Sequence, residues 1–436
     1  MNVPTTLVIV LIFASLLALL ASGMWVGLAI GAVGLVMLTF LVKTPEMVGT
    51  IMYNTLSSYV LAAVPFFIFV GEIILESGLS DRLFAGASKW TKVVPGGLIQ
   101  ANIIACALLS AVSGSSVSTA AAVGTVAYPE EVKRGYNANL VTGSLVAGGT
   151  LGPMIPPSIS MILYGGFVRV SVAKLFMGTL IPGMIMAAMF MLYIFMRHML
   201  NPQLGPKRDA LTLGYFRDSL TAWRDIWPFL PLVGIIFGGI YGGFMTPTEA
   251  AAVSAFVVIA LVLALRAVSF AVLKRAAFSA LKITAMVYLI VVSAKIMSYS
   301  LSMLGITHEL LTAVSTSNLS PLAIWGLLAL FYLLMGCFID AVSMLFLTLP
   351  LVYPLMTSLG FDPIWFGVIQ GITLEAGLLT PPVGMNLYVV QSFTKQPFDN
   401  VVRGSFPFFL LMLANIALLT FVPQLATWLP ATIMGR

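Results

Sequence analysis

The chain has 436 residues, of which 60% are hydrophobic and 8% are charged, and its formal net charge is +6. Soluble domains carry about 25% charged residues, so this composition excludes a water-soluble globular protein. The mean hydropathy is +1.06, and each apolar run of about 20 residues can cross a bilayer as a helix. The sequence therefore predicts an all-α polytopic membrane protein, in which the positive charge indicates orientation and not nucleic-acid binding.

Apolar helices are predicted from the first residues onward. Two are expected at 5–22 and 24–42, and because no Lys or Arg precedes Lys43, the basic region of a cleaved signal peptide is missing. The segments 43–59 and 205–225 are treated as connections, although either could hold an interfacial helix. Further spans are expected at 60–77, 138–165, 175–196, 227–245, 250–266, 283–303, 363–394 and 404–425.

Short motifs recur 225 positions later in the chain. Tyr128-Pro129 is matched by Tyr353-Pro354, and Pro156-Pro157 is matched by Pro381-Pro382. Motifs that share one offset without a gap are the signature of an internal repeat. Internal repeats are common in secondary transporters.

The basic residues indicate that the two repeats are inverted. The segment 128–137 carries Lys133 and Arg134, whereas its counterpart 353–362 carries no basic residue. Because Lys and Arg are enriched in cytoplasmic loops, equivalent loops are expected on opposite sides of the membrane. The predicted organisation is a first inverted repeat over 1–196, a cytoplasmic linker over 197–226 and a second inverted repeat over 227–436.

The same charge distribution predicts two re-entrant helical hairpins. Basic segments flank residues 97–127, so this stretch must enter and leave the membrane on one side. It fits two half-helices that break at Ser113–Ser116. The repeat predicts a second hairpin at 321–353, with its break between Gly336 and Asp340.

Prolines interrupt the span that follows each hairpin. The helix expected at 138–165 contains GPMIPPS at Gly152–Ser158, and the helix expected at 363–394 contains LTPPVGMN at Leu379–Asn386. Proline removes a backbone donor, and backbone that leaves helical geometry at membrane depth must be satisfied by protein, water or an ion. A single break could be a simple kink, but breaks in two symmetric pairs favour a transport site that binds Na⁺ and a carboxylate.

Charged residues in apolar segments are the other candidates for function. Asp340 could bind an ion, a proton or a basic partner, or could act structurally. Glu72 and Lys295 could pair across the repeats, or Lys295 could extend to the membrane interface. Glu249 is typical of an acid that caps a helix N-terminus. Glu375 precedes the second break and could be structural or close to an ion.

The cysteines and histidines predict no further site. Cys106 and Cys337 lie in separate apolar runs, and His198 and His308 lie in or next to connections. No Cys/His spacing is typical of a metal site, and a disulfide framework is not expected. We therefore expect no cofactor or metal apart from sodium as a coupling ion.

The motifs resemble those of the large membrane subunit of tripartite ATP-independent periplasmic (TRAP) transporters, the DctM-like family. The resemblance rests on Ser113–Ser116, Gly152–Ser158, Gly336 with Asp340, and Thr380–Gly384 with Asn386, and it covers nearly the whole chain. Val117-Ser118 departs from the pattern, because many relatives have a small residue or Pro there. This departure leaves the substrate preference open.

The resemblance implies an inner-membrane, elevator-type importer driven by a sodium gradient. Its expected partners are a small DctQ-like membrane subunit and a periplasmic DctP-like binding protein, which delivers the substrate. Expected substrates are small carboxylates such as C4-dicarboxylates, 2-oxo acids or sialic acids.

The resemblance also assigns three groups of site residues. The first sodium site would be framed by Ser113, Gly114, Ser115, Ser116, Gly152, Pro153 and Pro156. The second would be framed by Gly336, Asp340, Thr380, Pro381 and Gly384. The substrate would contact Ser115, Ser116, Pro157, Ser158, Asp340, Pro382 and Asn386.

Other functions fit less well. A sodium/dicarboxylate carrier that needs no binding protein would share this architecture, and the sequence barely separates the two. An intramembrane serine protease would need a histidine at membrane depth, and an aspartyl protease would need a second aspartate besides Asp340. No phosphate-binding P-loop indicates an ATPase, and a channel would have no use for occluding hairpins.

Overall fold

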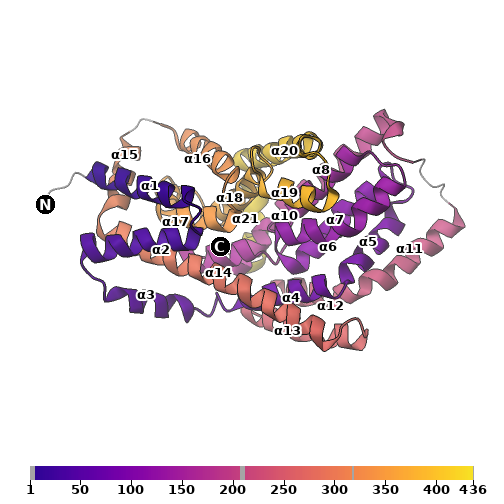
Figure 1. The fold of residues 1–436 in the computed structure, drawn as a ribbon, viewed down its shortest axis with the longest axis horizontal. Coiled ribbons are helices and arrows are strands. Elements are labelled where there is room, and N and C mark those ends of the chain that lie inside the picture. The colour runs from indigo at the N-terminus through magenta and orange to yellow at the C-terminus, as the bar shows by residue number, and fades with distance from the viewer. Residues whose placement is uncertain (1–4, 207–211, 317–318, 436) are drawn as a thin grey trace.

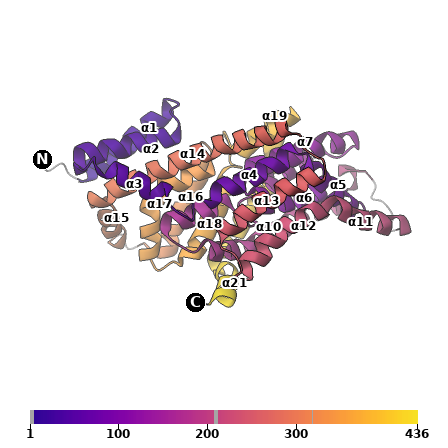
Figure 2. The same cartoon turned by 90° about the horizontal axis from the view of Figure 1, so that it is seen from below.

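The computed structural model describes residues 5–206, 212–316 and 319–435, and every regular element in these ranges is helical (Figures 1 and 2). The chain begins with α1 (Thr5–Ala21), α2 (Val26–Val36), a π-helical continuation (Met37–Val42) and α3 (Met47–Leu56). The rest of the first half holds α4 (Ala63–Glu76), α5 (Leu79–Thr91), α6 (Gly97–Ser113), α7 (Ser116–Lys133), α8 (Ala138–Gly149), α9 (Ile159–Val168) and α10 (Val172–Leu200).

A connecting region joins the halves. It holds two 3-10 turns (Pro202–Leu204 and Trp227–Phe229), α11 (Leu213–Ile226), α12 (Leu230–Val233), a π-helix (Gly234–Ile240) and α13 (Pro247–Ala264). The second half holds α14 (Phe270–Met303), α15 (Ile306–Ser315), α16 (Pro321–Gly336), α17 (Ala341–Ser358), α18 (Pro363–Gly377), α19 (Met385–Thr394), α20 (Phe398–Phe421) and α21 (Gln424–Met434).

The prediction of an all-α polytopic membrane protein is confirmed. By length and composition, six helices in the described ranges can cross a membrane, or seven if α4 and α5, which bend by 73°, count as one span. The spans predicted at 138–165 and 363–394 are each divided into two helices, α8–α9 and α18–α19. The segments 43–59 and 205–225, which were treated as connections, contain the helices α3 and α11.

Two helix pairs reverse direction at short turns. Helices α6 and α7 meet at Gly114, and α16 and α17 meet at residues 337–340. The predicted ends of these stretches, 127 and 353, are too early, because α7 continues to Lys133 and α17 to Ser358. The first end was set by taking 128–137 as a loop and the second by the repeat, whereas α7 continues through Pro129 and α17 through Pro354, as membrane helices tolerate when neighbouring groups satisfy the freed carbonyls.

The helices pack in two groups. Helices α2 and α4 pack against the long α14, which runs along one side of the molecule (Figures 1 and 2). Helix α13 packs against α4. Gly27, Gly31 and Gly34 of α2 face α14, and a Cβ on Gly34 would lie 3.0 Å from the backbone nitrogen of Met297. Small residues allow this close approach, which supplies the dispersion contacts that hold membrane helices together.

The second group contains the hairpins and the divided helices. Its tightest contact joins the two halves, where α8 crosses α20. A Cβ on Gly143 would overlap the carbonyl group of Gly404, and a Cβ on Gly404 would overlap the carbonyl oxygen of Asn139. Both positions therefore require glycine for packing reasons.

We expect Gly143→Ala to destabilise the protein by about 1–3 kcal/mol, because the added methyl group must push α8 away from α20. Gly326→Ala is the matched control, since a Cβ on this helical glycine would meet no atom within 4 Å, and alanine favours the helix by about 1 kcal/mol. The measurement is the thermal unfolding temperature of the purified variants in detergent. Equal unfolding temperatures for the two variants would contradict the packing at Gly143.

Candidate functional site

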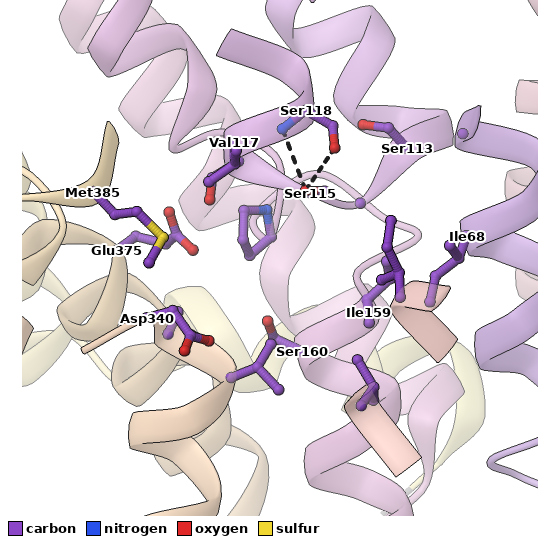
Figure 3. A pocket seen from close by; sticks show the side chains of 18 of the residues that line it. Ile68, Ser113, Ser115, Val117, Ser118, Ile159, Ser160, Asp340, Glu375 and Met385 are labelled. Atoms are coloured by element: carbon purple, nitrogen blue, oxygen red, sulfur yellow. Dashed lines mark hydrogen bonds between the residues drawn. The ribbon is translucent and has the colours of Figure 1, made fainter. Parts of the chain in front are cut away.

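A cavity of about 300 Å³ lies between the hairpins and the α4–α14 side of the molecule. Its apolar wall includes Ile68 of α4 and Ile283, Met286 and Val287 of α14. Figure 3 shows Ser113, Ser115 and Ser118 at one side of the cavity and Asp340 at another, with Glu375 and Met385 close by. Its polar lining residues are Glu72, Ser113, Ser115, Ser116, Ser118, Ser160, Asp340 and Glu375.

The first hairpin tip is built by a left-handed glycine and a serine cap. Gly114 has φ 60°, which ends α6, and the Ser115 side chain then caps α7 by accepting a hydrogen bond from the Ser118 backbone nitrogen at 3.4 Å. The Ser115 hydroxyl also donates to the Ser118 hydroxyl at 3.2 Å (Figure 3). The Ser113 and Thr119 hydroxyls lie 2.9 Å apart. Hydroxyls and free helix ends therefore gather at this tip.

The first tip lies directly against the divided helix of its own half. A Cβ on Gly114 would lie 2.7 Å from the carbonyl oxygen of Pro157, and a Cβ on Gly152 would lie 2.8 Å from the backbone nitrogen of Ser116. The backbone between α8 and α9 contains a cis peptide bond at Pro156-Pro157. Helix α9 begins again at Ser158, whose side chain accepts from the Met161 nitrogen at 3.3 Å. Two non-helical backbone segments thus touch in the interior.

The second tip has the same relation to the second divided helix. The Cys337 carbonyl oxygen accepts from the Gly384 nitrogen at 3.2 Å, and the Cys337 thiol donates to the Pro381 carbonyl oxygen at 3.1 Å. A Cβ on Gly336 would overlap the backbone of Gly377. A second cis peptide bond lies at Pro381-Pro382, at the position that corresponds to the first.

Asp340 caps the second half-helix and also faces the cavity. Its carboxylate accepts from the Ser343 nitrogen at 3.0 Å, at the N-terminus of α17. The same side chain lines the cavity wall. Asp340 is therefore a structural cap and, at the same time, a negative charge available to a bound cation.

Glu375 brings a buried carboxylate from the second half of the chain to the cavity. It lies in α18 with 1% of its surface exposed, and it lines the same cavity as Ser116 of the first tip. The negative charge of Asp340 also acts on it. Among the described residues, no hydrogen-bond partner is found for its Oε2 atom. A buried carboxylate oxygen without a donor is costly, so this oxygen is suited to a cation or a proton.

All charged residues that line the cavity are acidic. Glu72, Asp340 and Glu375 line it, whereas no Lys, Arg or His is among its lining residues. Within the described ranges, no group of three or more His, Cys, Asp or Glu side chains could hold a metal ion. The polar groups of the lining are carboxylates and hydroxyls, which suit hard cations, and no Cys or His is among its lining residues.

The structure brings only part of the predicted site to the cavity. Of the predicted residues, Ser113, Gly114, Ser115, Ser116, Pro153 and Asp340 line it. Those outside the lining are Gly152, Pro156, Pro157, Ser158, Gly336, Thr380, Pro381, Pro382, Gly384 and Asn386. Asn386 is fully buried, and no partner for its side-chain oxygen or nitrogen is found in the described part of the chain.

Sequence reasoning left out several residues of the cavity. Ser118 and Ser160 were not assigned to the site, and Glu72 and Glu375 were noted only as charges. The signal for Ser118 was its place one turn after the tip. Ser160 and Glu72 could not be placed without knowing how α9 and α4 pack.

Glu131 lies outside the cavity and was also misplaced. It belongs to the segment 128–137, which was expected to be a loop, but it lies fully buried in α7, where its carboxylate accepts from the Asn102 amide at 3.1 Å.

Two further expectations are resolved by the contacts. The suggested pairing of Glu72 with Lys295 is wrong, because the Lys295 ammonium donates to the Phe167 carbonyl oxygen at 2.7 Å and lies 4.0 Å from the centre of the Phe167 ring. The capping role of Glu249 is confirmed. Its carboxylate accepts from the Thr246 nitrogen at 2.8 Å, and its own nitrogen donates to the Thr246 hydroxyl at 3.3 Å.

Comparisons with known proteins agree with this architecture. The C4-dicarboxylate TRAP transporter large permease protein DctM of Vibrio cholerae is 32% identical over 86% of this chain and 87% of its own length. The 2,3-diketo-L-gulonate TRAP transporter large permease protein YiaN of Escherichia coli is 33% identical over 85% of this chain and 87% of its own length.

A solved structure shares the fold. The YdaH transporter of Alcanivorax borkumensis superposes with a TM-score of 0.65 over 88% of this chain and 89% of that chain, at 14% sequence identity. The family described as "Tripartite ATP-independent periplasmic transporter, DctM component" matches residues 13–425. This match and the two similar permeases show that the chain belongs to the DctM family of TRAP transporter large permeases.

Proposed function

We propose that the chain is the permease subunit of an uptake system that couples the entry of small organic acids to sodium ions. The observation that carries this proposal is the charge of the central cavity. Three carboxylates and two open hairpin tips face it, and no basic side chain is among its lining residues. An organic anion that entered alone would be repelled, so a cation must accompany it.

Backbone groups at the tips supply the complementary parts of the site. Helices α7 and α17 both begin at the cavity, and their first N–H groups and positive dipole ends suit a carboxylate. The C-terminal end of α6 at Ser113 supplies carbonyl oxygens, which suit Na⁺. Ser113–Ser116 with Gly152 and Pro153 remain our proposal for one sodium site, and Asp340 with the Thr380–Gly384 segment for the other.

Two inverted repeats and an elevator movement fit the packing. The elements from α6 to α9 recur as α16 to α19, with starting residues offset by about 225 positions. Both hairpins and both divided helices pack together, while α2 and α4 pack against α14 and α13 packs against α4. Sliding of the hairpins and divided helices against the α14 group would move both tips and both breaks together, while the α4 and α14 wall of the cavity stays in place.

The names of two relatives support a carboxylate as the solute. These relatives are named for a C4-dicarboxylate and for 2,3-diketo-L-gulonate, both of which carry carboxylates. We propose a small carboxylate as the solute of this chain, delivered by a periplasmic binding protein, with a small membrane subunit completing the complex in the bacterial inner membrane.

The proposed function is tested by reconstitution. The chain and a DctQ-like small subunit are placed in liposomes, and uptake of a small carboxylate bound by a DctP-like binding protein is measured. We expect accumulation only with an inward sodium gradient and only in the presence of the binding protein. Accumulation without the binding protein would indicate a self-sufficient carrier, and accumulation in potassium alone would contradict sodium coupling.

Asp340 variants separate capping from ion binding. Asparagine caps helices about as well as aspartate, so Asp340→Asn should keep the parent's unfolding temperature but raise the half-saturating sodium concentration about tenfold, equivalent to about 1.4 kcal/mol. Asp340→Ala should show the same sodium defect and also lose about 1 kcal/mol of stability. If Asp340→Asn retained the parent's sodium dependence, the residue would be a cap and not an ion ligand.

A further inference from the structure

A second hollow, of about 730 Å³, has the opposite charge from the central cavity. It lies where the end of α9 and the start of α10 face α3 and α14. Arg169 and Lys295 line it, and none of its lining residues is Asp or Glu. Its other polar lining residues are Asn54, Thr55, Ser58, Ser171, Ser298, Tyr299 and Ser302. We call it the basic pocket.

One hydrogen bond orients the Lys295 ammonium and leaves two of its N–H groups for a ligand. Its ammonium donates to the Phe167 carbonyl oxygen at 2.7 Å and lies over the Phe167 ring. An ammonium group carries three N–H donors, so this bond leaves two for a ligand in the pocket. The Lys295 side chain is half-buried, which strengthens any electrostatic interaction it makes compared with one in bulk water.

Arg169 brings a second positive charge to the same pocket. It ends α9 in a left-handed conformation with φ 61°, and its charge repels Lys295. The salt bridges of the described ranges join Lys89 to Asp225, Lys92 to Asp218, Arg134 to Glu130 and Arg275 to Glu76. Within those ranges, neither cation of the basic pocket has an acidic partner. A bound anion would relieve their repulsion.

A helix end adds to the positive potential. Ser171 lines the pocket and caps α10, a helix of 29 residues, by accepting from the Lys174 nitrogen at 3.4 Å. The positive end of the helix dipole and the unpaired N–H groups of the first turn favour anions. The hydroxyls around the pocket can donate to anionic oxygens as well.

We propose that the basic pocket is an anion-binding site, distinct from the central cavity, that holds the oxygens of a carboxylate, phosphate or sulfate group between Arg169 and Lys295. This inference does not depend on sodium-coupled uptake. Lys295 belongs to α14, and Arg169 to the segment between α9 and α10. A bound anion would therefore link the two packing groups of the molecule. Two sources share the required chemistry: a soluble organic anion and the headgroup of an anionic lipid.

The test is ligand-dependent thermal stability of the full chain, purified in a neutral detergent. Sodium sulfate and sodium succinate are each compared with sodium chloride at equal ionic strength. In a parallel arm, dioleoylphosphatidylglycerol is compared with dioleoylphosphatidylcholine. We expect the parent to be stabilised by an oxyanion beyond the effect of chloride. A shift with sulfate or succinate identifies a soluble anion, and a shift with phosphatidylglycerol alone identifies a lipid headgroup.

Matched variants locate the effect. Lys295→Met and Arg169→Asn remove one charge each, and asparagine suits the left-handed backbone at position 169. Each should abolish most of the shift, whereas the charge-conserving Lys295→Arg and Arg169→Lys should retain it. Arg169 is exposed, so its variants remain informative if a change at Lys295 impairs folding.

A central-cavity variant separates this proposal from the proposed function. Glu375→Gln should keep the oxyanion shift, because Glu375 lines the other cavity. The proposal is overturned if sulfate, succinate and phosphatidylglycerol all leave the parent unchanged. It is also overturned if the double variant of Lys295→Met and Arg169→Asn is stabilised as much as the parent. If sodium-driven uptake failed, the thermal shifts with soluble oxyanions and with phosphatidylglycerol would still test the basic pocket.

Discussion

Peptide groups at membrane depth need partners, and this constraint shapes the centre of the molecule. Four interruptions of helical backbone occur there: the tips at Gly114 and at residues 337–340, and the breaks at Pro156-Pro157 and Pro381-Pro382. Each tip is pressed against the break of its own half. Lipid cannot satisfy these groups, so protein, water or an ion must do so. We propose that the peptide dipoles left by these contacts bind ions and a solute.

The central cavity and the basic pocket carry opposite charges. The central cavity is lined by Glu72, Asp340 and Glu375, whereas the basic pocket is lined by Arg169 and Lys295. We propose that the basic pocket binds an anion and that a carboxylate enters the central cavity only together with cations. Glu375 is 1% exposed and lines the central cavity together with Ser116, so the buried charge comes from one half of the chain and the neighbouring hydroxyl from the other.

Local motifs predicted the interruptions but not what surrounds them. The Ser-Gly-Ser-Ser and double-Pro segments were placed correctly as breaks, because Gly and Pro act on the backbone locally. The hairpin ends at 127 and 353 were placed too early, since only tertiary packing shows that α7 continues through Pro129 and α17 through Pro354. The wrong pairing of Lys295 with Glu72 has the same origin. Symmetry in sequence does not reveal that Lys295 reaches the end of α9.

The central claim is that the paired tips and breaks bind the coupling ion. The most direct measurement is a cryo-electron-microscopy comparison of the purified transporter in sodium chloride and in choline chloride. The account predicts ion density in sodium alone, coordinated by oxygens of Ser113–Ser116 and of the Gly152–Pro153 backbone. Well-resolved tips with no ion in either condition would contradict it.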